Sequence, residues 1–208
     1  MTQTANPVLA FVWSGWTATW PTQLLALIWI AWLISWVVAS FFSARTEKHV
    51  RTWDSRAYRI PILAGAVLLT PWTAEILGEK PLWKLGNGVT YFLAGLTLAG
   101  ILFTWWARIH LGRFWSNAIT RKEGHRIIDT GPYGLVRHPI YTGLISAMLA
   151  TGIAVGTVTA LLGTLLIAFG LWQKARMEEG FLTTELGADA YGPYCRRVPM
   201  LVPFLRQR

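Results

Sequence analysis

The stretch 138–174, HPIYTGLISAMLATGIAVGTVTALLGTLLIAFGLWQK, decides the fold of this 208-residue chain. It contains no Asp, Glu, Arg or Lys before its final lysine. A single helix over its apolar part would be about 50 Å long, whereas the hydrocarbon core of a bilayer is about 30 Å thick. The stretch therefore predicts a hairpin of two membrane helices, at about residues 140–156 and 157–174, that turns near Gly156.

Small residues recur along the first leg of this hairpin. Gly143, Ala147 and Thr151 are spaced at i, i+4 and i+8, which places them on one face of a helix. Small side chains allow two membrane helices to approach each other closely. We expect this face to pack against the second leg.

Three further apolar runs precede the hairpin, at about residues 22–42, 58–77 and 89–109. Each is long enough for a helix to cross the bilayer. In the second run, Pro61 suits a first helical turn, and Pro71 is expected to kink the helix near its far end. Together with the hairpin, the runs predict an all-α, polytopic membrane protein with about five transmembrane helices, folded as a single domain over residues 1–208.

The composition supports a membrane protein over a nucleic-acid-binding one. Only 14% of the residues are charged and 53% are hydrophobic, whereas a soluble domain carries about 25% charged residues. The net charge of +9 comes from clusters separated by apolar runs, which is typical of loops that face the cytoplasm. Because Cys195 is the single cysteine, the chain cannot form an internal disulfide.

The basic residues also predict the orientation in the membrane. Five Lys and Arg lie between residues 43 and 59, six between 108 and 137, and six from 174 onwards. The remaining two, Lys80 and Lys84, fall on the other side of the predicted bilayer. The positive-inside rule then places the N-terminus outside and the C-terminus in the cytoplasm.

Two segments of the predicted cytoplasmic face, 111–143 and 174–203, carry the polar and aromatic residues suited to chemistry. The polar and aromatic residues of both segments also have a purely structural interpretation. Tyrosines anchor helices at membrane interfaces, and Lys174 with Glu178 forms an exposed i, i+4 pair. A metal site is not expected, because the four histidines are not arranged at ligand spacings and the cysteine stands alone.

The motifs in these segments follow a recognisable order. They read Leu111-Gly-Arg-Phe-Trp-Ser116, Glu123-Gly-His125, Gly131-Pro-Tyr133, Val136-Arg-His-Pro-Ile-Tyr141, Glu178-Glu179, Leu186-Gly187, Tyr191, Tyr194, Val198-Pro199 and Pro203. This order resembles the isoprenylcysteine carboxyl methyltransferase family, including its prokaryotic members. The resemblance covers about residues 111–203.

The resemblance implies an integral membrane methyltransferase that uses S-adenosylmethionine. It assigns cofactor binding to His125, Arg126, Ile127, Ile128, Tyr133, His138, Pro139, Tyr141 and Glu178. In eukaryotic relatives a basic residue four positions before the glutamate contacts the substrate. Here that residue is Lys174, with Arg176 nearby, and the catalytic role on the acceptor side stays open between the two.

The acceptor that the resemblance implies is lipophilic, either a small molecule or a lipidated protein, and membrane lipid is the surrounding partner. A prenylated cysteine carboxylate, a phospholipid amine and a small hydrophobic thiol or acid all fit. Two other functions compete. Membrane sterol reductases that use NADPH share a similar Arg-His-Pro-x-Tyr segment, and a non-enzymatic scaffold is the third. The Glu178-Glu179 pair and the short five-span plan favour methyl transfer over reduction.

Overall fold

The computed structural model describes residues 20–42, 46–49, 52–112, 115, 120–122 and 127–205. The helices are α2 (Trp20–Ser40), α3 (Thr52–Leu68), α4 (Pro71–Ile76), α5 (Asn87–Leu111), α6 (Pro132–Leu135), α7 (Pro139–Val155), α8 (Val158–Leu186) and α9 (Ala188–Arg197). Two short strands, β1 (Thr46–His49) and β2 (Thr120–Lys122), pair antiparallel and tie two loops together. The sequence did not predict this small pair, but the all-α fold class is confirmed.

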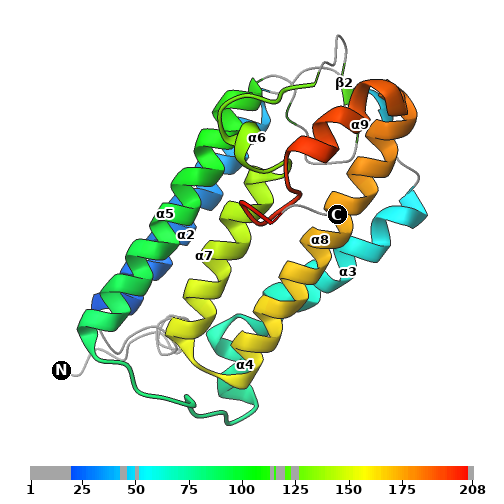
Figure 1. Cartoon of the computed structure of the whole chain (residues 1–208). Coiled ribbons are helices and arrows are strands. Elements are labelled where there is room, and N and C mark those ends of the chain that lie inside the picture. Colours follow the sequence, from blue (N-terminus) through cyan, green and yellow to red (C-terminus); the bar gives the residue numbers. More distant parts are fainter. Residues whose placement is uncertain are drawn as a thin grey trace, which may run out of the picture.

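The long helices form a curved row in which each packs on its neighbours in the order α2, α5, α7, α8, α3. Figure 1 shows α5, α7 and α8 side by side, with α2 behind α5 and α3 on the far side of α8. The short helices α6 and α9 lie together at one end of the row, and α4 lies at the other. We call the first of these the α6–α9 end.

Three of the described helices have the length and apolar composition of membrane spans. Residues 23–40 of α2, together with α5 and α8, are long and apolar enough to cross a bilayer, and α7 is a shorter apolar helix. Large apolar side chains such as Leu27, Phe92 and Leu165 are exposed on the outer faces of these helices. Such an apolar exterior suits lipid and not water. The chain is therefore a polytopic membrane protein, as predicted, while the count of five spans stays a prediction.

The hairpin turns where the sequence predicted. Gly156 ends α7 in the left-handed region, with φ 69° and ψ 19°, a conformation that glycine adopts without strain. Thr157 caps α8, and its side-chain oxygen accepts a hydrogen bond from the backbone N–H of Ala160 at 3.2 Å. From there α8 continues past residue 174, the predicted end of the second leg, to Leu186. Its last turns therefore lie at the α6–α9 end.

The prediction that Gly143, Ala147 and Thr151 face the second leg is wrong, because they pack against α5. A Cβ on Gly143 would lie 2.5 Å from the carbonyl oxygen of Gly100. Ala147, one turn after Gly143 on α7, also packs against Gly100. Thr151, one turn later again, approaches Thr97 of α5, and their hydroxyl oxygens are 3.3 Å apart. The spacing identified a close-packed face, but it did not identify the neighbouring helix.

The two prolines of the second apolar run also differ from the prediction. Because α3 begins at Thr52, Pro61 lies inside the helix and not in its first turn. Pro71 is the first residue of the separate helix α4 and so starts a helix instead of kinking one. The earlier start brings charged residues of the preceding basic segment, including Arg59, onto the first turns of α3.

Candidate active site

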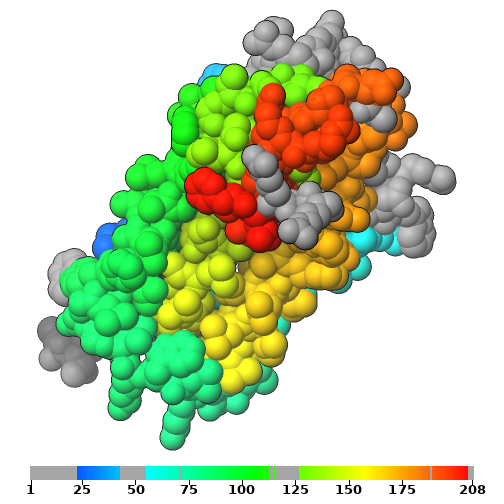
Figure 2. All heavy atoms as spheres, viewed as in Figure 1, coloured from blue at the N-terminus to red at the C-terminus, as the bar shows by residue number. Residues whose placement is uncertain are grey.

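A cavity of about 570 Å³ lies between the helices of the row, near the α6–α9 end. Its polar part is lined by Tyr133, Arg137, His138, Tyr141, Glu178, Tyr191 and Tyr194, together with Ile127 and Ile128. Its apolar part is lined by Trp32, Trp36, Ile62, Leu63, Leu144 and Leu171. Figure 2 shows α9 and the residues after it lying across the front of α6 and α7. A cavity with two such parts can hold a polar ligand in one part and an apolar ligand in the other.

The start of α7 is held by the chain segment that follows α9. The backbone N–H of Arg137 donates to the carbonyl oxygen of Pro199 at 2.8 Å, and that of His138 donates to Met200 at 3.1 Å. Pro139 has no N–H to satisfy and occupies the first helical position, where its fixed φ suits a helix start. The Arg-His-Pro triplet therefore joins α7 to the C-terminal segment and points its two polar side chains toward α8.

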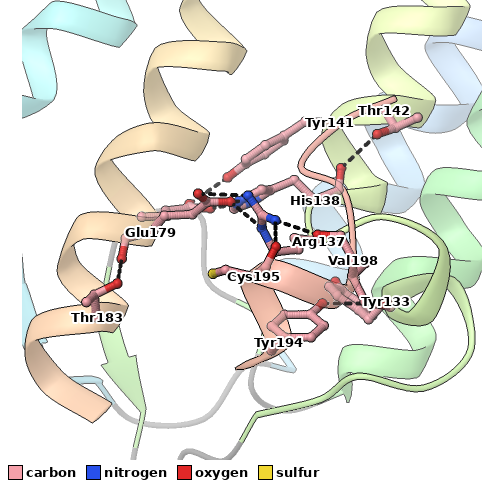
Figure 3. Close-up of polar contacts among 11 residues, drawn as sticks. Tyr133, Arg137, His138, Tyr141, Thr142, Glu179, Thr183, Tyr194, Cys195 and Val198 are labelled. Atoms are coloured by element: carbon pink, nitrogen blue, oxygen red, sulfur yellow. Dashed lines mark hydrogen bonds and ion pairs between the residues drawn. The ribbon is translucent and has the colours of Figure 1, made fainter. Parts of the chain in front are cut away.

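The two glutamates of α8 meet the motif of α7, and Figure 3 shows Glu179 pointing toward Arg137 and His138. The hydroxyl of Tyr141 donates to Glu178 Oε1 at 2.6 Å. His138 lies between the two carboxylates, with Nδ1 3.4 Å from Glu178 Oε2 and Nε2 3.2 Å from Glu179 Oε1. The rings of His138 and Tyr141 stack at 5.5 Å between their centres. Residues about 40 positions apart in the sequence thus form one partly buried polar network.

Arg137 fixes Glu179 and the end of α9 at the same time. Its Nε and Nη2 donate to the two oxygens of Glu179, at 2.7 Å and 3.1 Å. Its Nη1 donates to the carbonyl oxygens of Cys195, at 2.7 Å, and Val198. Burial opposes the charge on Arg137, but the hydrogen bonds and charge of Glu179 outweigh it and raise the pKa. A two-pronged ion pair of this kind fixes geometry as well as charge.

The position of His138 between two carboxylates favours its protonated form. Burial alone would lower the pKa of His138. Hydrogen bonds and charges from Glu178 and Glu179 act in the opposite direction and prevail, so the pKa of His138 is raised. Because an imidazolium donates from both ring nitrogens, one proton on each nitrogen satisfies both carboxylates.

This arrangement predicts a stability that falls as the pH rises. A group whose pKa is raised by folding contributes stability that is complete below its unfolded pKa, about 6.5 for histidine. That contribution is lost as the pH rises through the folded pKa of His138. We expect the thermal midpoint of the detergent-solubilised protein to fall as the pH is raised above the unfolded pKa of about 6.5. The His138→Gln variant should show a flatter curve, and parallel curves for the two proteins would contradict the assignment.

Aromatic side chains close the polar part of the cavity. Tyr194 of α9 donates its hydroxyl to the carbonyl oxygen of Tyr133 at 2.8 Å. The ring of Tyr133 stacks on His110 with 6.3 Å between ring centres. Burial raises the pKa of both tyrosines, so their hydroxyls stay neutral and keep their protons at neutral pH. The flat faces and hydroxyl groups of this lining suit a polar ligand that carries an aromatic ring.

Lys174 lies where the polar and apolar parts meet. It is 8% exposed, and its Nζ is 5.2 Å from the ring centre of Tyr141 and 5.6 Å from that of Tyr58. Such distances allow the cation to interact with the ring faces. Glu178 follows one turn later on α8, so a positive and a negative side chain lie on the same helix face at this boundary.

Comparison of the sequence with known proteins identifies a family. The model of the isoprenylcysteine carboxyl methyltransferase family matches residues 93–184. The protein-S-isoprenylcysteine O-methyltransferase of Schizosaccharomyces pombe is 30% identical over 191 residues, covering 79% of this chain and 77% of the relative. The chain belongs to the isoprenylcysteine carboxyl methyltransferase family. It is therefore a membrane methyltransferase.

Two further relatives show how varied the related proteins are. The protein-S-isoprenylcysteine O-methyltransferase B of Arabidopsis thaliana is 28% identical over 150 residues, which are 69% of this chain and 73% of the relative. The cobalt-zinc-cadmium resistance protein CzcN of Cupriavidus metallidurans is 28% identical over 158 residues, which are 74% of this chain and 69% of the relative. Among the described residues, no group of three or more His, Cys, Asp or Glu side chains is placed to hold a metal ion.

The structure brings most of the residues predicted for the site into one cavity. Those that line it are Ile127, Ile128, Tyr133, His138, Pro139, Tyr141, Lys174 and Glu178. Arg176 is exposed and lies outside the lining, with its guanidinium 5.9 Å from the ring centre of Trp172. His125 and Arg126 fall outside the described residues. The roles given to all of these residues remain predictions.

The sequence interpretation missed the contributions of α2 and α3. Trp32 and Trp36 line the apolar part from α2, and Tyr58 and Arg59 reach the boundary from α3. Both helices precede the part of the chain that matches the family model. On α2, the i, i+4 spacing of Trp32 and Trp36 was a signal that the two side chains share one face. Tyr58 and Arg59 gave no comparable signal, because they lie where the predicted basic loop ends.

Proposed function

We propose that this methyltransferase transfers the methyl group of S-adenosylmethionine to a lipophilic acceptor at the cytoplasmic face of the membrane. The observation that carries the proposal is a cavity in which a polar network around Glu178 meets an apolar wall at Lys174. The polar part suits the cofactor and the apolar part suits the tail of the acceptor. Segments 111–143 and 174–203 hold the cofactor, in one domain that spans the chain.

The residues present fit S-adenosylmethionine, a zwitterion that carries an adenosine and a sulfonium. When bound, it supplies a methyl group activated by the positive sulfur. Glu178 would accept hydrogen bonds from its ribose or amino group, and the rings of Tyr133 and Tyr141 would stack on adenine or face the cationic sulfur. His138, Pro139, Ile127 and Ile128 complete the described wall, and we assign His125 and Arg126 to the same pocket.

The chain's own contribution to the reaction is alignment and exclusion of water. Methyl transfer is an in-line displacement, so the protein needs to hold the two reacting atoms in line at about 3–3.5 Å. The partly buried network of Arg137, His138 and Glu179 holds α7, α8 and α9 in place around the cavity. A carboxylate acceptor needs no general base, whereas an amine or a thiol needs its proton removed.

The direction of entry follows from the charges along the sequence. We place the α6–α9 end in the cytoplasm, because the three basic clusters adjoin it, with the N-terminus outside and the C-terminus inside. The cofactor then enters from water at this end. The acceptor, a lipophilic small molecule or a lipidated protein, reaches the apolar part from the bilayer. The curated relatives named as isoprenylcysteine methyltransferases make a prenylated carboxylate the first acceptor to test.

Calorimetric titration of the detergent-purified protein with S-adenosylhomocysteine tests the cofactor. We expect micromolar binding of this product and none of NADPH, since family membership disfavours the reductase considered from the sequence. Binding of NADPH alone would assign the same residues to a reductase. Absence of binding by both ligands would contradict the proposed pocket.

Lys174 lines the cavity and Arg176 does not, so we expect substitutions at the two positions to have different effects. Lys174→Ala should lower kcat/KM for the acceptor by about tenfold or more and leave the Kd of S-adenosylhomocysteine near that of the wild type. Arg176→Ala should leave both nearly unchanged, because this side chain lies outside the cavity lining. Steady-state kinetics with a radiolabelled methyl donor measures both variants. Loss of acceptor turnover in Arg176→Ala alone would reverse the assignment.

A further inference from the structure

The chain that follows α9 is held against the start of α7 through its backbone. The carbonyl oxygens of four successive residues, 199–202, each accept a hydrogen bond. The first two bind the backbone at the start of α7, and that of Leu201 accepts the hydroxyl of Thr142 at 2.7 Å. The carbonyl oxygen of Val202 accepts the backbone N–H of Leu205 at 3.3 Å, which closes a turn. The fold therefore fixes the conformation of this segment.

The turn presents three large apolar side chains on the outside of the protein. Val202 is 55% exposed, Phe204 94% and Leu205 64%. We call these three residues the apolar tip. Met200, just before them, is buried, and Phe204 has φ 67°, in the left-handed region that bulky residues rarely adopt. Apolar side chains that a fixed backbone presents together indicate a surface that meets a partner, because such clusters are unfavourable in water.

The apolar tip lies on a lipid-facing side of the row of helices. Thr142, which binds this segment, is on the same stripe of α7 as Leu149 and Ile153, at i, i+7 and i+11. Leu149 and Ile153 are exposed, and α7 contains no charged residue, so this stripe suits acyl chains. Figures 1 and 2 show the chain after α9 lying across the front of α7 near its start. The tip therefore continues the apolar exterior of α7.

The backbone of the tip determines how deep it can lie in a bilayer. Irregular backbone exposed to lipid is excluded from the hydrocarbon core, because its N–H and C=O groups would find no partners there. At the boundary between head groups and acyl chains the backbone stays solvated while apolar side chains insert. Thr142 lies about one turn after the uncharged helix α7 begins at Pro139, directly beyond Arg137 and His138. The tip is therefore level with this boundary.

The charges around the tip favour a membrane surface over a second copy of this chain. The sequence places arginines on both sides of the tip, at positions 196, 197, 206 and 208, and no Asp or Glu between residues 190 and 208. Of these arginines, Arg197 also pairs with Asp129. An apolar group flanked by arginines is typical of segments that bind membranes with anionic head groups. A second copy, with its net charge of +9, would repel them.

We propose that the apolar tip is a membrane-docking surface that inserts into the bilayer interface beside the start of α7. The segment after α9 is then held by the protein on one side and by lipid on the other. The same segment follows α9, which supplies Tyr191 and Tyr194 to the cavity, so contact with lipid supports one wall of the site. This inference depends on the membrane location of the chain and not on the proposed cofactor or acceptor.

The test measures the depth of spin labels on the full-length protein in nanodiscs of phosphatidylcholine and phosphatidylglycerol. Val202→Cys, Phe204→Cys and Leu205→Cys are made one at a time in a Cys195→Ser background. Each variant then carries one cysteine for the nitroxide and keeps two apolar residues of the tip. Collisions of the label with oxygen, which dissolves in acyl chains, are compared with collisions with a water-soluble nickel chelate. The thermal midpoint of each labelled protein checks its fold.

Two labelled control variants calibrate the measurement. Leu165→Cys reports on lipid, because Leu165 is exposed on the membrane-length helix α8. Asp189→Cys reports on water, because Asp189 is exposed on α9. We expect the ratio of oxygen to nickel collisions at all three tip positions to exceed the ratio at position 189 several-fold and to approach that at position 165.

Two results would overturn the inference. Ratios at the tip equal to the ratio at position 189 would place the tip in water. Few collisions of either kind, with dipolar broadening between labels on neighbouring molecules, would show that a second copy of this chain covers the tip instead of lipid.

Discussion

Replacing Glu178 with glutamine should weaken the binding of S-adenosylhomocysteine by about ten- to hundredfold. A hydrogen bond to a charged group contributes about 1.5–3 kcal/mol, and about 1.4 kcal/mol corresponds to a factor of ten in affinity. Glu178 is the carboxylate that faces the polar part of the cavity, and it accepts the Tyr141 hydroxyl at 2.6 Å. Glutamine keeps the size of the side chain but removes the charge, so the loss reports on electrostatics and not on shape.

The fold should survive this substitution. His138 keeps its second carboxylate partner, Glu179, and Arg137 holds that carboxylate from the other side. Calorimetry measures the affinity, and the thermal midpoint in detergent checks the fold. Glu75→Gln is the control, since this glutamate is exposed on α4 at the opposite end of the bundle. An unchanged Kd in Glu178→Gln would remove Glu178 from the cofactor pocket.

The clustering of polar side chains at the start of α7 was predictable from sequence because its signals are local. The Arg-His-Pro triplet and Tyr141 lie within five consecutive residues, and the proline fixes the helix start that orients them. Glu178 required the family pattern, since no spacing rule joins a tyrosine to a glutamate 37 positions away. The hairpin between them was predictable because an uncharged stretch too long for one span has to turn.

The neighbours of each helix were not predictable in the same way. A periodic stripe of small residues shows that one face is close-packed, but its partner depends on the whole arrangement of the bundle. Gly143 therefore belongs to the contact with α5, while Gly152 faces Thr164 of α8. Arg59 was counted among the five basic residues of the loop 43–59, at the edge of the predicted span 58–77, yet α3 starts at Thr52 and carries it to the cavity.

The Gly100→Val substitution should destabilise the protein by about 3 kcal/mol or prevent it from folding. A Cβ on Gly100 would lie 2.6 Å from the carbonyl oxygen of Gly143 and 2.9 Å from the backbone nitrogen of Ala147. Both are backbone atoms, so no side chain can rotate away to relieve the clash, and α5 has to separate from α7. Because α7 carries His138 and Tyr141 at its start, the displacement should also reduce binding of S-adenosylhomocysteine.

Gly95→Val is the matched control for this prediction. Gly95 lies on the same helix, and a Cβ at that position would meet no atom within 4 Å beyond the adjoining backbone of its own helix. Both variants therefore make the same change in helix propensity, and only Gly100→Val closes space against another backbone. The thermal midpoint and the fraction of protein that is monodisperse in detergent measure the difference. Equal midpoints for the two variants would show that α5 and α7 do not pack through Gly100, and the cavity would then need another explanation for how its α7 wall is held in place.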